Sequence, residues 1–122
     1  MAEAFARAYG SDVLSAHSAG LAPASIIQPL TRQMLYEKNI PAGDLFPKGL
    51  EMFRDEAFDV IVNLSGHALP PFAIARTPRV LVWPVTDPIG QKDVVYREVS
   101  ARLESLVMGL ILELRSMRAD VT

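Results

Sequence analysis

Few residues of this chain have side chains suited to chemistry, and Asp87 is the most informative of them. Asp87 precedes Pro88 and follows an apolar run that ends at Trp83. An aspartic acid can donate a proton to a leaving group where burial and a neighbouring anion raise its pKa. By itself, however, an Asp-Pro pair is also a common way to open a turn. The chain contains no cysteine, and its two histidines, His17 and His67, are far apart, so we predict neither a disulfide nor a metal site.

Composition places the chain among ordinary globular domains. Its 122 residues are 50% apolar and 21% charged, which fits a single domain over residues 1–122 with a real core. The formal net charge is -2 and no run of lysine or arginine occurs, so neither nucleic acid nor an acidic membrane surface is expected as a partner. No apolar run reaches the roughly 18 residues that a membrane span needs. We therefore expect a cytoplasmic protein.

Helical and strand patterns alternate along the chain. Apolar spacing and turn residues predict helices at about 1–9, 25–38, 50–57 and 91–118, and strands at 13–17, 58–64 and 79–83. The uninterrupted apolar run of Val60, Ile61 and Val62 is typical of a strand that is buried on both faces. The alternation predicts an α/β fold with a parallel sheet.

The last predicted helix is apolar almost all the way round between Leu106 and Leu112. The simpler interpretation is that this turn is the most deeply buried part of the helix. A protein interface is the alternative. Gly109 would allow a neighbour to approach closely, but it does not identify that neighbour.

Four segments in fixed order resemble the low-molecular-weight protein tyrosine phosphatase superfamily, which also contains the thioredoxin-coupled arsenate reductases. They are Met1-Ala-Glu-Ala-Phe5-Ala-Arg7, His17-Ser-Ala-Gly20-Leu21, Lys48-Gly-Leu50 and Trp83-Pro-Val-Thr-Asp87-Pro-Ile-Gly90. Members of that superfamily begin with an apolar strand and a phosphate-binding loop of the form Cys-x5-Arg, and only then reach the helix at which this chain starts. The resemblance implies a phosphotyrosine protein phosphatase I-like fold of three layers, a small parallel sheet with helices on both faces, here missing its central first strand.

The resemblance also implies roles for individual residues. Asp87 matches the general acid that protonates the leaving oxygen of a phosphate monoester. Ser18 matches a serine that supports the phosphate loop through an asparagine, which is missing as well, and Lys48 belongs to a structural helix start. The substrate of a full-length relative would be a phosphorylated protein or a small phosphate ester, and no cofactor is implied. Because the chain has neither the cysteine nucleophile nor the arginine clamp, we expect these 122 residues alone to be inactive.

The branch of the superfamily stays open. Arsenate reductases carry a second redox cysteine where this chain has Ser65, and a hydroxyl cannot relay a disulfide. The segment from Trp83 to Gly90 nevertheless looks more like the reductase branch. An arsenate-reductase-like relative that has lost its redox cysteines is therefore an alternative to a phosphatase.

The missing first strand would leave the middle of the sheet open, which is costly because peptide groups need partners and apolar side chains need cover. The flanking strands could pair directly, or a second copy could supply the cover. The chain could also be an N-terminally truncated version of a longer protein, since Met1 coincides with an internal methionine of the superfamily; we favour this origin. For the chain as it stands we predict a homo-oligomer, namely an intertwined or strand-supplying dimer. A noncatalytic, homo-oligomeric binding protein is therefore the other alternative function.

Overall fold

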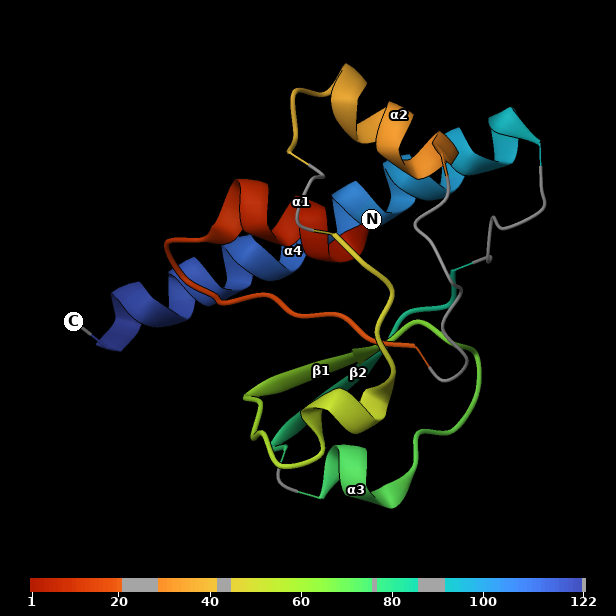
Figure 1. The fold of residues 1–122 in the computed structure, drawn as a ribbon. Coiled ribbons are helices and arrows are strands. Elements are labelled where there is room, and N and C mark those ends of the chain that lie inside the picture. The colour runs from red at the N-terminus through yellow and green to blue at the C-terminus, as the bar shows by residue number, and fades with distance from the viewer. Residues whose placement is uncertain (21–28, 42–44, 76, 86–91, 122) are drawn as a thin grey trace.

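The computed structural model describes residues 1–20, 29–41, 45–75, 77–85 and 92–121, with side chains up to residue 117. Figure 1 shows its elements in chain order, which are α1 (Ala2–Gly10), α2 (Pro29–Glu37), the 3-10 helix η1 (Leu50–Phe53), β1 (Val60–Asn63), α3 (Pro71–Ile74), β2 (Arg79–Val82) and α4 (Asp93–Val121). Helices and strands therefore alternate as predicted in the second half of the chain.

The sheet consists of β1 and β2, which run parallel. Val60 is paired with Arg79 and Asn63 with Val82, so the register is regular over four residues. The two strands are joined through α3, which lies with η1 on one side of the sheet, whereas α1 and α4 lie on the other side (Figure 1). The predicted α/β fold, a small parallel sheet between helical layers, is confirmed.

The hydrophobic core lies mainly between α1 and α4. Phe5, Leu35 and Ile111 are completely buried, and α4 contributes Val99, Leu103, Val107 and Ile111, which follow one another at intervals of four residues on one helical face. Gly10, at the end of α1, is essential to this packing, because a Cβ there would lie 2.7 Å from the side chain of Ile111. The core therefore depends on a close approach of the two helices.

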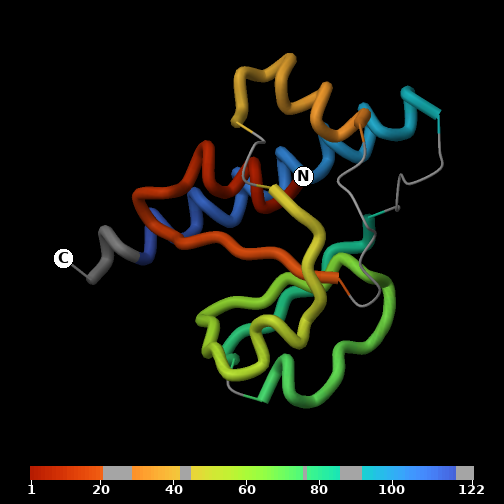
Figure 2. Tube along the Cα trace, in the orientation of Figure 1, coloured from red at the N-terminus to blue at the C-terminus, as the bar shows by residue number. Residues whose placement is uncertain are grey.

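Residues 13–17 do not form the predicted strand. In the described part of the chain, Leu14 to Ala19 belong to no helix or strand, and only Gly20 forms an isolated parallel bridge with Gly49, through its N–H to the carbonyl oxygen of Lys48 at 2.8 Å. A strand is defined by its hydrogen-bonded neighbour. Figure 2 shows this segment, in orange, running past β1, in green, without being paired to it in the described residues.

Further differences concern the extent of the elements and the burial of their side chains. The helix predicted at 50–57 is only the single turn of η1, and the short helix α3 was not predicted. Val60, Ile61 and Val62 are half-buried rather than covered on both faces. In α4, Val107 and Ile111 are buried but Leu112 is 58% exposed and nothing in the described structure lies within 4 Å of a Cβ at Gly109. Residues 106–112 therefore face the core on one side of the helix, and Leu112 lies on the other.

Candidate functional site

A buried cluster of charged and polar side chains lies at the start of α1. The carboxylate of Glu3 accepts a hydrogen bond from the hydroxyl of Ser18 at 2.7 Å and from Nζ of Lys48 at 3.3 Å. Its second oxygen is paired with Arg7, one turn later in α1, at 3.2 Å. Glu3, Ser18 and Lys48 come from three of the four segments quoted above, so the fold brings these separate parts of the sequence to one carboxylate.

Burial raises the free-energy cost of holding charged groups in this cluster. The side chains of Glu3 and Lys48 are only 3% and 7% exposed. Burial alone would raise the pKa of Glu3, but the hydrogen bonds from Ser18 and Lys48 and the positive charges of Lys48 and Arg7 outweigh it and hold the pKa below its usual value. Glu3 is therefore ionised at neutral pH, and it is the partner that allows Lys48 to be buried as a cation.

The N-terminal amine of Met1 lies near the same cluster. Burial lowers the pKa of the Met1 amine, while attraction by Glu3 raises it and repulsion by Lys48 lowers it further. Lys48 also donates to the carbonyl oxygen of Phe46 at 3.1 Å and lies 4.5 Å from the centre of that ring. The start of α1 is thus enclosed by the protein, with positive and negative groups close together.

Ser18 therefore has a different role from the one expected. The resemblance implied a serine that supports a phosphate loop, and in this structure its hydroxyl donates to Glu3. The contact joins residues 14–19 to α1 and fixes the position of the segment that was predicted to be a strand. Ser18 acts here as a structural brace.

Ser65 lies in a tight turn at the carboxyl end of β1. Its hydroxyl donates to Oδ1 of Asn63 at 2.6 Å and accepts the N–H of His67 at 3.1 Å. The amide of Asn63 donates to the carbonyl oxygen of His67 at 2.7 Å, which closes the turn. Asn63 is buried at 9% exposure, and Ser65 is held beside it by this local hydrogen-bond network.

The ring of His17 packs against two aromatic rings. It meets Phe53 and Phe58 edge-on at 5.5 and 5.8 Å, and the two phenylalanine rings meet at 5.8 Å. This aromatic trio joins the extended segment to η1 and to the start of β1. The ring of His17 therefore has a packing role in this structure.

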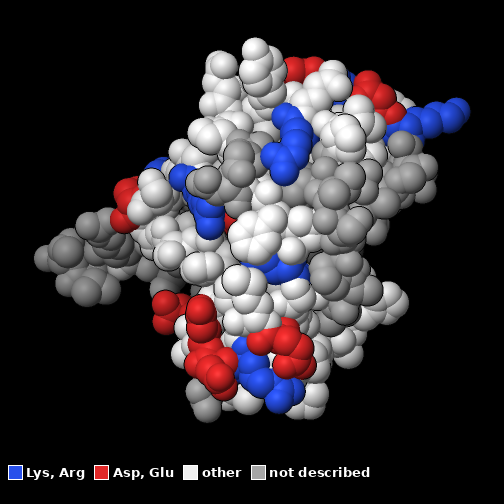
Figure 3. All heavy atoms as spheres, viewed as in Figure 1, with Lys and Arg blue, Asp and Glu red and all other residues white. Residues whose placement is uncertain are grey.

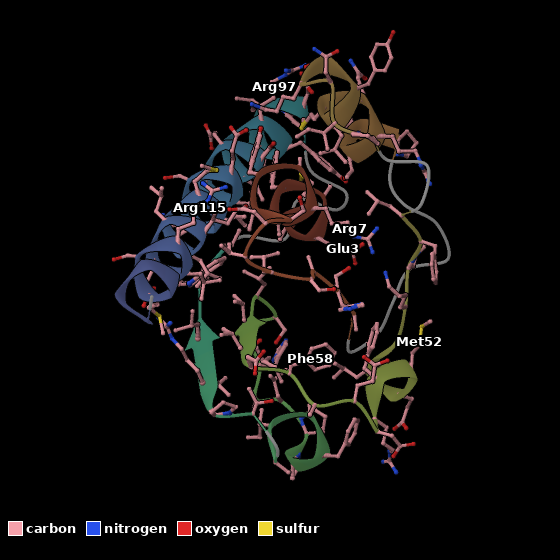
Figure 4. The ribbon with its side chains drawn as sticks, turned by 90° about the vertical axis from the view of Figure 1, so that its left-hand side faces the viewer. Glu3, Arg7, Met52, Phe58, Arg97 and Arg115 are labelled. Carbon is pink, nitrogen blue, oxygen red and sulfur yellow. The ribbon has the colours of Figure 1, made fainter. Side chains whose placement is uncertain are left out.

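A cavity of about 710 Å³ lies between the extended segment and β1. Residues 13–20 form one wall and residues 56–65 the opposite one, while the first turn of α1 and the side chains of Val107, Leu110 and Leu114 in α4 close it on one side. Phe53 and Phe72 contribute from the other helical layer. Figure 4 shows Glu3 and Phe58 on opposite sides of this space.

Asp87, the predicted catalytic residue, lies outside the described residues. The chain is described as far as Val85, and Trp83 and Val85 are partly buried against the core. Trp83 also lines the cavity. The role of Asp87 therefore stays a prediction.

The next two statements, on metal-binding groups and on membrane-spanning helices, hold for the described residues alone. These residues contain no group of three or more histidine, cysteine, aspartate or glutamate side chains that could hold a metal ion. Among the helices that the structure describes, none combines the length and the apolar character that a membrane span needs.

Comparison with protein families defines the class. The family model of the low molecular weight phosphotyrosine protein phosphatases matches residues 1–120. Since this is nearly the whole sequence, the chain belongs to the low molecular weight phosphotyrosine protein phosphatase family. The comparison with curated proteins gave no match.

Solved structures with this fold include several arsenate reductases. One in the phosphate binding state has a TM-score of 0.81 and 29% identity, and the match covers 93% of this chain and 86% of that one. One in the reduced state has a TM-score of 0.77 and 30% identity, with 92% and 86% covered. A third, from Archaeoglobus fulgidus, has a TM-score of 0.74 and 26% identity, with 90% and 86% covered. The superfamily resemblance is thereby confirmed.

The buried cluster around Glu3 was missed by sequence reasoning. Ser18 and Lys48 were noted as parts of separate segments, and Glu3 was not singled out at all. A usable signal was present, because the three segments carry one carboxylate, one hydroxyl and one ammonium group. Complementary chemistry makes these three side chains candidates for a contact, but their spacing in the sequence does not show that they meet.

Proposed function

We propose that this chain is the supporting part of a low molecular weight phosphatase and has no turnover by itself. In the complete active site, a cysteine from outside these 122 residues would attack the phosphorus of a phosphate monoester, an arginine from the same loop would hold the phosphoryl oxygens, and Asp87 would protonate the leaving oxygen. The observation that carries the proposal is the family match over residues 1–120 in a sequence without cysteine. The substrate would be a phosphorylated protein or a small phosphate ester, and the compartment the cytoplasm.

The structural relatives make an arsenate-reductase-like origin the second candidate. The three quoted above are described as arsenate reductases. Thioredoxin-coupled reduction requires cysteines that form and pass on a disulfide, and Ser65 instead uses its hydroxyl to build a turn. We therefore propose that the chain has no reductase activity, whichever branch it came from.

An assay with p-nitrophenyl phosphate tests the proposed inactivity. We expect the purified chain to release no nitrophenol above the buffer blank, because a proton donor without a nucleophile has no substrate complex to act on. The matched control is Asp87→Asn, which we expect to be indistinguishable from the parent chain. Turnover by the parent that is lost in Asp87→Asn would contradict the proposal.

The gene offers an independent test of the phosphatase assignment. If the nucleotide sequence immediately upstream of the Met1 codon encodes, in frame, an apolar run followed by Cys-x5-Arg, expression from that upstream start should give p-nitrophenyl phosphatase activity that Asp87→Asn reduces by about 10²- to 10⁴-fold. A stop codon in that position would rule out the full-length enzyme and leave the noncatalytic protein.

We retain the association of two copies as part of the noncatalytic alternative. Val82 in β2 is 66% exposed, and Leu112 and Met117 in α4 are 58% and 52% exposed. Covering exposed apolar side chains with a second surface is favourable in free energy. Sedimentation should then show a dimer at micromolar concentrations, and a monomer at every concentration would contradict this alternative.

A further inference from the structure

We propose that the outer edge of β2 is a dimer interface, in which two copies of this chain join their β2 strands in antiparallel orientation about a twofold axis at Leu81. This interface rests on the association of two copies that was kept above as the noncatalytic alternative, and it gives that association a surface and a register. It does not depend on whether the chain hydrolyses a phosphate ester.

The outer edge of β2 carries unpaired peptide groups. The N–H of Trp83 donates to the carbonyl oxygen of Asn63 in β1 at 3.1 Å. Because peptide groups alternate in direction along a strand, Leu81 also faces β1. Val80 and Val82 therefore turn their N–H and C=O outward. In the described sheet β2 is paired with β1 alone, so these two valines offer two donors and two acceptors to a further strand.

Exposed side chains along the same segment are all apolar. From residue 77 to residue 85, half-buried and exposed residues alternate, and the exposed ones are Pro78, Val80, Val82 and Pro84. Val80 and Val82 are 41% and 66% exposed. A strand with one face in water normally carries polar side chains on that face, and an uncovered edge strand is usually protected by charged ones. An apolar stripe in this position is typical of an interaction surface.

The opposite face of β2 is attached to the rest of the molecule. Arg79 is paired with Glu113 of α4 at 2.7 Å, and Trp83 packs against the hydrophobic core. Side chains alternate between the two faces of a strand, so the apolar stripe faces away from α4. It is therefore available to a second molecule without any rearrangement of the fold.

Symmetry of the stripe about Leu81 makes a second copy its occupant. The stripe reads Pro-x-Val-x-Val-x-Pro in both directions, and an interface with a twofold axis requires a surface that is complementary to itself. In antiparallel pairing centred on Leu81, Val80 of each copy lies opposite Val82 of the other, and all outward donors and acceptors are used. Sliding one strand by two residues would instead place a proline, which has no N–H, opposite a valine. The two prolines thus select the register and end the ladder.

Acidic side chains favour the antiparallel orientation. Four exposed carboxylates lie before β1 in the chain, those of Glu51, Asp55, Glu56 and Asp59, and Figure 3 shows acidic side chains gathered at this end of the molecule. Because β1 and β2 are parallel, a second β2 strand running parallel to the first would bring the acidic ends of both copies to the same side, where they repel each other. An antiparallel second copy places the two acidic ends at opposite ends of the dimer.

Sedimentation of the full 122-residue chain tests the interface. We expect a reversible dimer at micromolar concentrations. Val82→Lys puts a charge into the stripe opposite an apolar side chain of the second copy and should weaken the dimer at least about tenfold. Val94→Lys is the matched control, because Val94 is also exposed, at 58%, and belongs to the first turn of α4, which lies next to α2 and away from β2 (Figure 1). It should leave the dissociation constant of the dimer unchanged.

A double variant, Val80→Glu with Val82→Lys, tests the register. In the proposed pairing each glutamate lies opposite a lysine of the other copy, and opposite charges on paired strands should restore the dimer to within about threefold of the parent. In a register shifted by two residues, two glutamates or two lysines would face each other instead. A double variant that stays as weak as Val82→Lys would therefore overturn the proposed pairing.

Amide exchange in the parent chain gives a reading that needs no substitution. The amides of Val80 and Val82 should exchange more slowly as the protein concentration rises and the dimer forms. The amide of Leu81 faces β1 and should not change. Exchange of the two valine amides that is independent of concentration, in a chain that does dimerise, would overturn the interface.

Failure of this interface can be told apart from failure of the noncatalytic alternative. A parent chain that is monomeric at every concentration would overturn both. A dimer that Val82→Lys leaves intact, with the fold of the variant confirmed by circular dichroism, would overturn the interface alone, because the two copies would then associate through another surface. A dimer that Val82→Lys weakens and the double variant restores would support the interface and its register together.

Discussion

At the scale of single residues, Glu3 joins three separate segments of the described structure. Its carboxylate connects α1 to the extended segment through Ser18 and to residues 46–48 through Lys48. Breaking a buried ion pair by removing one partner leaves the other charge without compensation, which costs far more free energy than loss of an exposed pair. The stability of the protein is therefore predicted to be highly sensitive to substitutions in the buried cluster at the start of α1.

Glu3→Gln should strongly destabilise the protein. The substitution keeps the shape of the side chain but leaves the ammonium group of Lys48 buried without its counter-charge, and we expect a loss of about 3 kcal/mol in the free energy of unfolding. The measurement is urea denaturation followed by circular dichroism. The control is Glu37→Gln, which removes the carboxylate from an exposed pair with Arg97 and should change the stability little.

The same carboxylate predicts how stability depends on pH. The pKa of Glu3 is lowered in the folded protein, so its contribution is complete above the unfolded pKa of about 4.3 and is lost as the pH falls through the folded pKa. The parent chain should therefore lose stability more steeply than Glu3→Gln between neutral pH and the acid range. Parallel curves for the two proteins would contradict the role assigned to Glu3.

At the scale of elements, the contact of α1 with α4 determines the position of the buried cluster. Gly10 lies against Ile111, which is completely buried. Tyr9 donates to Glu104 at 2.6 Å, and Arg115 binds both oxygens of Asp12 at 2.9 Å and the carbonyl oxygen of Tyr9 at 2.7 Å. These contacts on α4 hold the end of α1, so its first turn is presented at the cavity in one orientation.

Gly10→Ala tests this close approach. The added Cβ would lie 2.7 Å from two carbon atoms of Ile111, and overpacking of this kind costs about 1–3 kcal/mol. Gly109→Ala is the control within the described structure, since nothing there lies within 4 Å of its added Cβ, and the higher helix propensity of alanine should stabilise α4 by up to about 1 kcal/mol. The two thermal unfolding midpoints should move in opposite directions, and a stabilised Gly10→Ala would show that the helices can separate freely.

The elements also show which features the sequence could predict. β1, β2 and α4 follow from patterns within single segments, and their predicted bounds agree with the structure to within about two residues, apart from the end of α4. The predicted strand at 13–17 failed because strand formation needs a hydrogen-bonded neighbour, and neither described strand is paired with this segment. Similarly, the apolar pattern of residues 106–112 predicted burial, but a helix pattern does not say whether a partner is present to cover Leu112.

At the scale of the whole molecule, the fold is that of the phosphatase family. The fold and the family could be predicted from the order of four short segments, and both are confirmed. The convergence of Glu3, Ser18 and Lys48 could not be predicted from the spacing in sequence, because it depends on how α1 packs on α4.

Hydrogen exchange at the two neighbouring amides of Val62 and Asn63 tests the central claim, the open edge of β1, most directly. The N–H of Trp83 donates to the carbonyl oxygen of Asn63. Because peptide groups alternate in direction along a strand, the N–H of Asn63 faces β2 and that of Val62 faces away from β2. We predict that the Val62 amide exchanges at least about 100-fold faster than the Asn63 amide. Equal protection of the two amides would show that the edge is already covered and would contradict the account.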